Sequence, residues 1–375
     1  MHTLSLVVLA GWVLTLVCTV LNLLTVPRMP RRVPRSTPLV SVIVPARDEE
    51  RAIRRTVTAL LAQTYPALEV IVVDDRSTDA TVAILAELAA GDPRLVIVHG
   101  DEPPPGWLGK PSALHRGSLT ARGELLLFMD ADILYEPEAV AAAVAHLEAR
   151  QISMLSLFPH IEMRGFWEHV LMPNLAVFLF CFVPLWAANR SRVPLFAIGG
   201  GPGNLVRRRD YEAAGGHTSL SDAVVDDVAL ARLLRRRGFR TEAVRAEDFA
   251  SMRMYHGFGE IVSGFTKNAF ATFGRRYGVA AFILALCLVF HLGPFVVALT
   301  GDRLALITIG LIALTRLVIF LPFRYGVVNA LFGHPLMIAG WGYIMLRSVW
   351  YTGIRRQLHW RGRTYDAGKT RFGAD

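Results

Sequence analysis

The stretch Leu125-Leu126-Leu127-Phe128-Met129-Asp130-Ala131-Asp132 is an apolar run that ends in two carboxylates separated by one residue. Such a run is typical of a strand buried on both faces, so the acidic pair is expected at the carboxyl edge of a sheet. Open α/β sheets bind ligands at that edge. Carboxylates with this spacing suit a hard divalent cation that also carries phosphate oxygens. An isolated acidic pair also fits the cap of a following helix, so the neighbouring motifs have to decide.

The composition indicates a chain that is partly embedded in a membrane. Of the 375 residues, 53% are hydrophobic, and the mean hydropathy of +0.39 exceeds that of ordinary soluble proteins. The net charge of +9 comes from arginine clusters beside apolar stretches, which favours an anionic membrane face over nucleic acid as a partner. The three cysteines lie inside apolar runs and are interpreted as core or lipid-facing residues.

The first residues predict a membrane anchor. Leu4 to Val26 is an apolar stretch of about the ~20 residues that cross a bilayer, and arginines follow it directly. A cleavable signal peptide has the reverse order of charge and apolar residues. We therefore expect an anchor over 1–27 and a basic, proline-rich linker over 28–38. The arginines predict that the chain continues on the cytoplasmic side of the cell (inner) membrane.

Strand and helix patterns alternate over residues 39–255. Buried strands are predicted at 40–45, 70–73, 95–98 and 125–129, with helices between them, and acidic clusters follow three of the strands. Strands that alternate with helices predict an α/β domain with a mostly parallel, Rossmann-like sheet. The three acidic clusters therefore converge on one sheet edge, which favours a ligand site over a helix cap.

Four motifs in this region resemble the family 2 inverting glycosyltransferases of the GT-A fold. They are Val-Pro-Ala-Arg-Asp-Glu at 44–49, Val-Asp-Asp-Arg-Ser-Thr-Asp-Ala-Thr at 73–81, Gly-Lys-Pro-Ser-Ala-Leu at 109–114 and Met-Asp-Ala-Asp at 129–132. The resemblance implies Mg²⁺ or Mn²⁺ as cofactor, with Asp132 as a metal ligand and Asp130 near the metal and the ribose. It also implies a set of residues that bind the nucleotide sugar: Pro45, Ala46, Arg47, Glu49, Asp75, Lys110 and Asp130.

Two further motifs are candidates for the sugar and acceptor region. The resemblance implies that the second member of the pair Asp226-Asp227 is the catalytic base, although the family commonly has Glu where this chain has Asp226. A carboxylate beside an acceptor hydroxyl can remove the hydroxyl proton during attack on the anomeric carbon. The alternative interpretation is that these aspartates only stabilise the N-terminus of the following helix through its dipole. Gly200, Gly201 and Asn204 belong to a glycine-rich stretch that is either a loop beside the donor sugar and acceptor or a plain turn.

The remaining segments are apolar. We expect interfacial helices over about 165–188, with a buried helix pair as the alternative, and an amphipathic interfacial segment over 256–277. Residues 278–352 contain three apolar stretches, and Arg316 in the second is costly unless it faces protein or snorkels. The basic tail, 353–375, is expected in the cytoplasm. One stretch must then be re-entrant, and the third, broken at Gly333, His334 and Pro335, is the candidate.

Together these features predict an inverting glycosyltransferase that moves a sugar, with UDP as the expected carrier, to a hydroxyl or carboxyl of a membrane lipid. The stretch Tyr255 to Asn268 lacks the Gln-x-x-Arg-Trp segment of processive relatives, which argues against the alternative of a polysaccharide synthase. This stretch and Gly106 to Lys110 look more like glycosyltransferases associated with carotenoid or hopanoid lipids. A non-catalytic nucleotide-binding scaffold is a third possibility. The donor sugar, the acceptor and the oligomeric state are left open.

Overall fold

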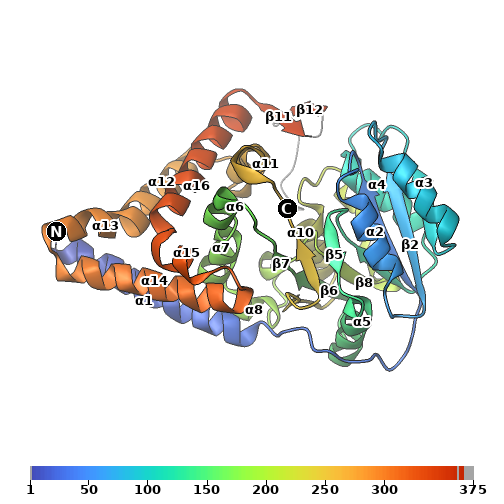
Figure 1. Ribbon diagram of the computed structural model, residues 1–375, viewed down its shortest axis with the longest axis horizontal. Helices are drawn as coiled ribbons and strands as arrows, with labels where there is room; N and C mark the ends of the chain where they lie inside the picture. Colours follow the sequence, from blue (N-terminus) through green and yellow to red (C-terminus); the bar gives the residue numbers. More distant parts are fainter. Residues whose placement is uncertain (1, 361–362, 367–375) are drawn as a thin grey trace. The chain divides into compact units, whose positions relative to one another are not determined.

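The computed structural model describes residues 2–360 and 363–366 of the chain (Figure 1). They divide into two compact units. The α/β unit holds residues 26–162 and 187–254, and the apolar unit holds residues 2–25, 163–186 and the described residues from 255 onward. Part of the predicted tail, 353–375, falls outside the described residues, namely 361–362 and 367–375.

A seven-stranded sheet in the order β3-β2-β1-β4-β8-β6-β9 forms the centre of the α/β unit. Only β8 runs antiparallel to its neighbours, so the prediction of a mostly parallel sheet is confirmed. A smaller sheet has the order β5-β10-β7. The strands are β1 (Val40–Ala46), β2 (Leu68–Asp74), β3 (Leu95–His99), β4 (Leu125–Phe128), β5 (Ile133–Tyr135), β6 (Met154–Phe158), β7 (His160–Ile161), β8 (Asn204–Arg207), β9 (Thr241–Arg245) and β10 (Ala250–Met252).

Both faces of the large sheet are covered by helices because its strands are apolar on both sides. Val42 and Val44 pack with α2 (Ile53–Leu61), α3 (Thr81–Gly91) and α5 (Ala139–Arg150) on one face. Ile43, whose side chain alternates to the other face, packs there with α4 (Gly109–Thr120), α9 (Arg208–Ala214) and α10 (Asp226–Arg236). The unit is thus a three-layer α/β fold.

The linker after the anchor lies against the α/β unit. The backbone N–H of Met29 donates to the carbonyl of Arg245 at 2.8 Å, and the N–H of Arg245 donates to the carbonyl of Pro27 at 2.9 Å. Further along, the N–H of Arg35 donates to the carboxylate of Glu148 at 2.9 Å. The linker therefore covers β9, the edge strand of the large sheet, which would otherwise offer unpaired backbone groups.

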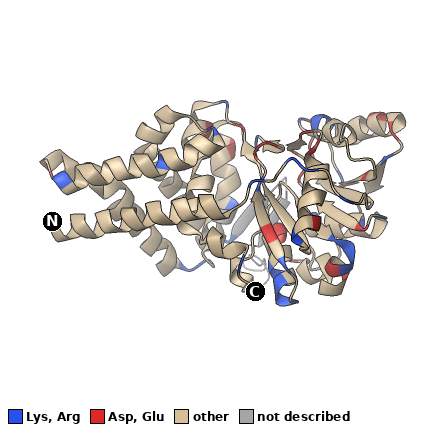
Figure 2. Cartoon of the chain, turned by 90° about the horizontal axis from the view of Figure 1, so that it is seen from below, with Lys and Arg blue, Asp and Glu red and all other residues tan. Residues whose placement is uncertain are grey.

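The apolar unit is mostly helical and carries few charges (Figure 2). Three helical stretches of the described residues are long and apolar enough to cross a membrane: His2–Thr25, Tyr277–Thr300 and Arg303–Phe323. The third C-terminal stretch is broken at Gly333, and neither the helix Val327–Phe332 nor the helix that begins at His334 is among these three candidate spans. The elements are α1 (His2–Thr25), α6 (Phe166–Leu171), α7 (Asn174–Phe182), α11 (Gly257–Thr272), α12 (Tyr277–Leu286), α13 (Gly293–Val297), α14 (Arg303–Phe323), α15 (Val327–Phe332) and α16 (His334–Ser348), while α8 (Leu185–Ala188) joins the two units and β11 (Gln357–Trp360) pairs with β12 (Arg363–Asp366).

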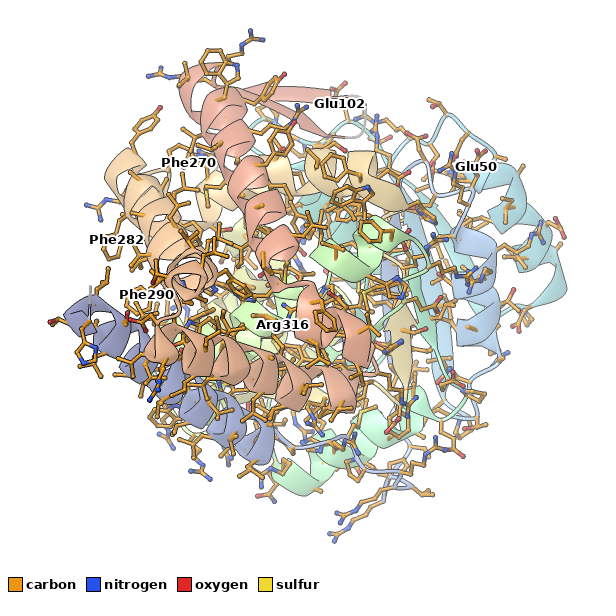
Figure 3. The ribbon with its side chains drawn as sticks, turned by 60° about the vertical axis from the view of Figure 1, so that its left-hand side comes forward. Glu50, Glu102, Phe270, Phe282, Phe290 and Arg316 are labelled. Carbon is orange, nitrogen blue, oxygen red and sulfur yellow. The ribbon has the colours of Figure 1, made fainter. Side chains whose placement is uncertain are left out.

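Polar side chains inside the apolar unit bond to protein groups. Asn22 of α1 donates to the carbonyls of Phe180 and Val183 at 2.8 Å each. Arg316 of α14, labelled in Figure 3, faces protein: its Nε donates to the carbonyl of Ala330 at 2.9 Å, and its guanidinium lies over the ring of Phe320. These bonds satisfy groups that would be costly next to lipid.

Candidate active site

The carboxyl ends of β2, β1 and β4 bring the predicted nucleotide residues to one edge of the sheet. These three strands are parallel neighbours, and Ala46 at the end of β1 lies opposite Asp74 at the end of β2. Arg47, Asp75 and Asp130, which lie one or two residues beyond the ends of these strands, are therefore at the same edge. The N–H of Asp75 donates to the carbonyl of Ala46 at 2.7 Å, which joins the first two segments.

Arg47 and Asp75 form a polar contact beside the half-buried Pro45. Nη1 of Arg47 donates to the backbone carbonyl of Asp75 at 3.0 Å and lies 3.5 Å from its carboxylate. Glu49 is held through its N–H, which donates to the hydroxyl of Thr81 at 2.8 Å. The structure thus gathers Pro45, Ala46, Arg47, Glu49 and Asp75 around the ends of β1 and β2.

Lys110 connects the two acidic motifs. It lies in the first turn of α4, and its Nζ is 2.7 Å from Oδ1 of Asp130 and 3.3 Å from Oδ1 of Asp226. Burial alone would lower the pKa of Lys110, but Asp130, Asp226 and Asp227 outweigh burial and hold the pKa well above its usual value. A permanently charged ammonium group therefore lies between carboxylates that are far apart in the sequence.

The acidic pair Asp226-Asp227 opens α10, where the helix dipole favours negative charge. Asp226 is buried, and burial raises its pKa to about 6, with Lys110 acting in the opposite direction. Burial also raises the pKa of Asp227, while Lys110 lowers it. Asp227 is half-buried, and its carboxylate accepts hydrogen bonds from the N–H groups of Val228, at 2.7 Å, and Gly201.

The glycine-rich stretch packs directly against both acidic motifs. The N–H of Asp130 donates to the carbonyl of Gly201 at 2.9 Å. A Cβ at Gly201 would collide with Oδ2 of Asp130, and a Cβ at Gly199 would collide with the backbone carbonyl of Asp227. Only glycine permits the stretch to pack this closely against Asp130 and Asp227.

Within this stretch, the side chain of Asn204 bonds to Gly200 and to Ser156. Asn204 is buried at the start of β8, and its Oδ1 accepts from the hydroxyl of Ser156 at 2.8 Å and from the N–H of Gly200 at 3.3 Å. The Ser156 hydroxyl also lies 2.9 Å from the carbonyl of Ile198. Asn204 therefore holds the glycine-rich stretch in place through its side-chain oxygen, which accepts both bonds.

Asp132 is half-buried and lies just before β5, two residues after Asp130. Among the residues that the structure describes, no group of three or more His, Cys, Asp or Glu side chains could hold a metal ion by itself. Mg²⁺ is commonly held by one or two carboxylates together with substrate phosphates. The pair Asp130 and Asp132 fits that donor set, in which the nucleotide supplies the remaining oxygens.

No local sequence pattern points to several residues that support the site. The hydroxyl of Tyr135 donates to the carbonyl of Pro202 at 2.8 Å, next to the glycine-rich stretch. The N–H of Leu108 donates to the carbonyl of Ser221 at 2.8 Å and so joins the segment before Lys110 to the segment before α10. His217 is buried, with Nδ1 2.8 Å from the hydroxyl of Tyr211, and burial lowers its pKa to about 3. These residues are common types in unremarkable local sequence, and only the fold brings them to the site.

Comparison with known families covers the region that carries this site. Residues 41–213 match the family model described as "Glycosyl transferase family 2". The match includes most of the motifs described above: those at the ends of β1, β2 and β4, Lys110, and the glycine-rich stretch. It does not include Asp226-Asp227.

Similar proteins extend the match over most of the chain. The 4,4'-diaponeurosporenoate glycosyltransferase of Staphylococcus aureus (strain MRSA252) is 26% identical over 352 residues, which cover 88% of this chain and 89% of that protein. The protein of the same name from Staphylococcus haemolyticus (strain JCSC1435) is 29% identical over 244 residues, 64% of this chain and 63% of its own. Among solved structures, mannosyltransferase PcManGT from Pyrobaculum calidifontis, in complex with GDP-Man and Mn²⁺, superposes with a TM-score of 0.60 at 21% identity, covering 93% of this chain and 99% of that one.

Proposed function

We propose that this glycosyltransferase transfers a sugar from a nucleotide diphosphate to a membrane lipid, with inversion at the anomeric carbon. The basis is the match of residues 41–213 to the glycosyl transferase family 2 model. The acceptor is a hydroxyl or carboxyl of an isoprenoid lipid of the carotenoid or hopanoid class. The names of the relatives support a carotenoid-acid acceptor.

The observation that carries the proposal is the cluster of Lys110, Asp130, Asp226 and Asp227. Lys110 lies within 3.3 Å of a carboxylate from each acidic motif, so the donor-side Asp130 and the acceptor-side pair share one cation. When the diphosphate occupies the site, Lys110 can turn from Asp130 toward the phosphate oxygens and balance their charge. The cluster thus links donor binding to the position of the base.

The donor, with UDP as the expected nucleotide, binds at the ends of β1 and β2. Arg47, Glu49 and Asp75 would surround the base and ribose there. Asp132 and Asp130 would hold Mg²⁺ or Mn²⁺, which when bound supplies positive charge to the departing diphosphate. The Mn²⁺ in the PcManGT complex is consistent with this choice. The glycine-rich stretch, packed against Asp130 and Asp227, would lie beside the sugar.

Asp227 acts on the acceptor. A hydroxyl acceptor must lose a proton during attack, and Asp227 would take it because its pKa is raised toward the operating pH. A carboxyl acceptor is already ionised near neutral pH and needs no base. In that case Asp227 would position the acceptor, and its replacement would cost less. The two acceptor classes therefore predict different consequences for the same substitution.

The apolar unit supports a membrane location. Three helices have the length and composition of membrane spans, and Arg28, Arg31, Arg32 and Arg35 follow the first of them. By the positive-inside rule, the α/β unit would lie on the cytoplasmic side of the cell (inner) membrane, in a multi-pass protein.

The experiment is an assay of the purified full chain with a panel of labelled sugar nucleotides and a total lipid extract. We expect label in the lipid phase for one donor, and we expect metal removal to abolish it. Label in an aqueous polymer would favour a processive synthase instead. Intact donor with every sugar nucleotide, in the presence of Mg²⁺ and Mn²⁺, would contradict the proposal.

A further inference from the structure

A second site lies at the opposite edge of the large sheet. A pocket of about 370 Å³ is lined by Arg150 at the end of α5, Arg235 near the end of α10, Arg240 and Thr241 at the start of β9, and Arg190 and Arg192. β9 is parallel to β6, and β6 runs in the same direction as β4 because β8 is antiparallel to both. The pocket is therefore at the amino edge, whereas Asp130 is at the carboxyl edge.

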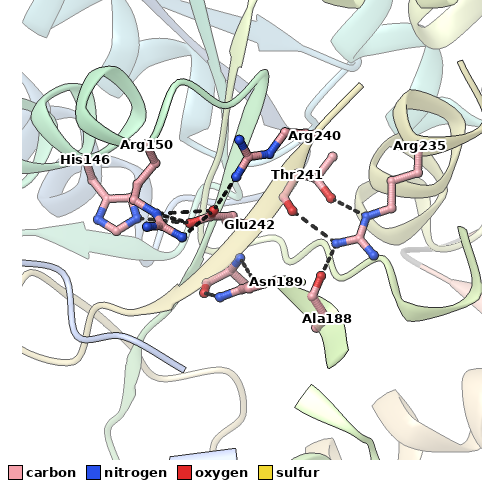
Figure 4. Close-up of polar contacts among 9 residues, drawn as sticks. His146, Arg150, Ala188, Asn189, Arg235, Arg240, Thr241 and Glu242 are labelled. Carbon is pink, nitrogen blue, oxygen red and sulfur yellow. Dashed lines mark hydrogen bonds and ion pairs between the residues drawn. The ribbon is translucent and has the colours of Figure 1, made fainter. Parts of the chain in front are cut away.

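The back of the pocket is rigid, and Figure 4 shows the contacts that fix it. Arg235 is buried; its Nε donates to the hydroxyl of Thr241 at 2.8 Å, and its Nη2 donates to the carbonyls of Thr241, at 3.0 Å, and Ala188. Asn189 exchanges two hydrogen bonds of 2.8 Å with the backbone of Ala243. These bonds hold the segment that carries Arg190 and Arg192 against β9.

The charge of this pocket is not balanced within the protein. Its lining contains five arginines and, among the residues that the structure describes, no acidic side chain. Glu242 lies behind it and is shared: Arg150 donates to it at 2.9 Å, and Arg240 lies 3.5 Å away. Burial lowers the pKa of Arg235 to about 10 despite the opposite effect of Glu242, as expected for a cation with too little negative charge nearby.

Two of the arginines have free donors. No hydrogen bond or ion pair joins the guanidinium of Arg190 or Arg192 to another residue in the described part of the chain, and both side chains are exposed at the pocket. Arginine forks match the oxygens of phosphate in pairs, and the volume is in the range of small-ligand pockets. A singly charged carboxylate would leave most of these donors unused.

We propose that the Arg190–Arg192 pocket binds a phosphate-bearing anion, distinct from the nucleotide diphosphate of the active site. Arg190 and Arg192 supply the direct contacts, and Arg150, Arg235 and Arg240 supply the surrounding charge. The arginine pair follows Trp186, the last residue of the apolar segment 163–186, by four and six positions. A lipid headgroup and a free phosphate compound share the chemistry that this pocket recognises, and this proposal does not depend on the proposed transferase reaction.

The test measures binding by isothermal titration of the full chain in zwitterionic detergent. The ligands are inorganic phosphate, dihexanoyl phosphatidylglycerol and dihexanoyl phosphatidylcholine. We expect wild type to bind at least one of the first two, and Arg190→Gln/Arg192→Gln to bind it about tenfold or more weakly, since charged hydrogen bonds are lost. Tighter binding of phosphatidylglycerol than of phosphate identifies a lipid headgroup, and binding of phosphate alone identifies a soluble ligand; both support the site.

Three controls separate the pocket from general charge and from the active site. Arg54→Gln/Arg55→Gln removes the same charge from the exposed side of α2 and should keep wild-type affinity. Lys110→Gln, which alters the active-site cluster, should keep it too. Arg190→Lys/Arg192→Lys should restore part of the binding, because charge returns without the paired donors. The proposal is overturned if wild type binds neither anion, or if the two Gln double variants weaken binding equally.

Discussion

Replacing Lys110 with Met removes the cation between Asp130 and Asp226 and keeps most of the volume of the side chain. The carboxylate of Asp226 is buried and loses a partner at 3.3 Å. It need not remain charged, because it can take up a proton. The cost is therefore limited to the free energy of protonating a group whose pKa is about 6 in the wild type.

The size of the effect follows from that limit. Each pH unit above the pKa adds about 1.4 kcal/mol, so at about pH 7.5 the loss of stability from Asp226 is about 2 kcal/mol. Asp130 contributes little, because its side chain is 35% exposed and water can replace Lys110. For an α/β unit of this size, about 2 kcal/mol lowers Tm by about 4–8 °C. Near pH 5.5 Asp226 is already mostly protonated, and the loss should nearly vanish.

The assay is thermal unfolding followed by tryptophan fluorescence at both pH values. It compares wild type, Lys110→Met, Asp226→Asn and the double variant. In the Asp226→Asn background, Lys110→Met should cost clearly less at pH 7.5 than it does alone, because no buried carboxylate is left unpaired. A loss in Tm that is the same at both pH values, or the same in the two backgrounds, would refute this account of the cluster.

Three further predictions concern catalysis and stability. With a hydroxyl acceptor, Asp227→Asn should lower turnover by ~10²- to 10⁴-fold with donor affinity nearly unchanged, and Asp226→Asn should be affected less; with a carboxyl acceptor, the loss in Asp227→Asn should be smaller. Equal losses of turnover in the two variants, measured by steady-state kinetics, would not support the assignment of Asp227, and a severe loss confined to Asp226→Asn would move the base one residue upstream. Asp132→Asn should nearly abolish transfer and weaken metal-dependent nucleotide binding, measured by titration with and without Mn²⁺; full wild-type turnover in excess EDTA would contradict it. His217, with its pKa lowered to about 3, stays neutral in the folded protein, whereas in the unfolded chain it takes up a proton below about pH 6.5. The free energy of unfolding should therefore fall by about 2 kcal/mol more in wild type than in His217→Gln when the pH drops from about 6.5 to about 5. Parallel profiles of Tm against pH in the two proteins would exclude this contribution.

The strands of the nucleotide side could be predicted because each is a local pattern. An apolar run followed by a carboxylate fixes both the strand and the edge at which it ends, and β1, β2 and β4 lie where such runs predict. The alternation of strands and helices predicts that these strands are parallel, so their carboxyl ends share one edge. The contact between Arg47 and Asp75 follows from that arrangement.

The other half of the sheet could not be predicted in this way. β8 enters antiparallel between β4 and β6, and no local period of the sequence encodes that insertion. The contact of Gly199 with Asp227, and the meeting of Arg150, Arg190 and Arg235 in one pocket, depend on it. The glycine-rich stretch and the arginines were visible as residue types, but their partners lie 28 to 85 positions away in the chain.

Among the described residues, the chain passes between the two units four times, after Thr25, Glu162, Trp186 and Met254. A protease that cuts any one of these connections leaves the α/β unit attached to the apolar unit through the other three. Cleavage at all four would give two pieces, 26–162 and 187–254, which share one sheet because β8 pairs with β4 and with β6. A single cut at one of these four places therefore cannot release the α/β unit intact from the apolar unit.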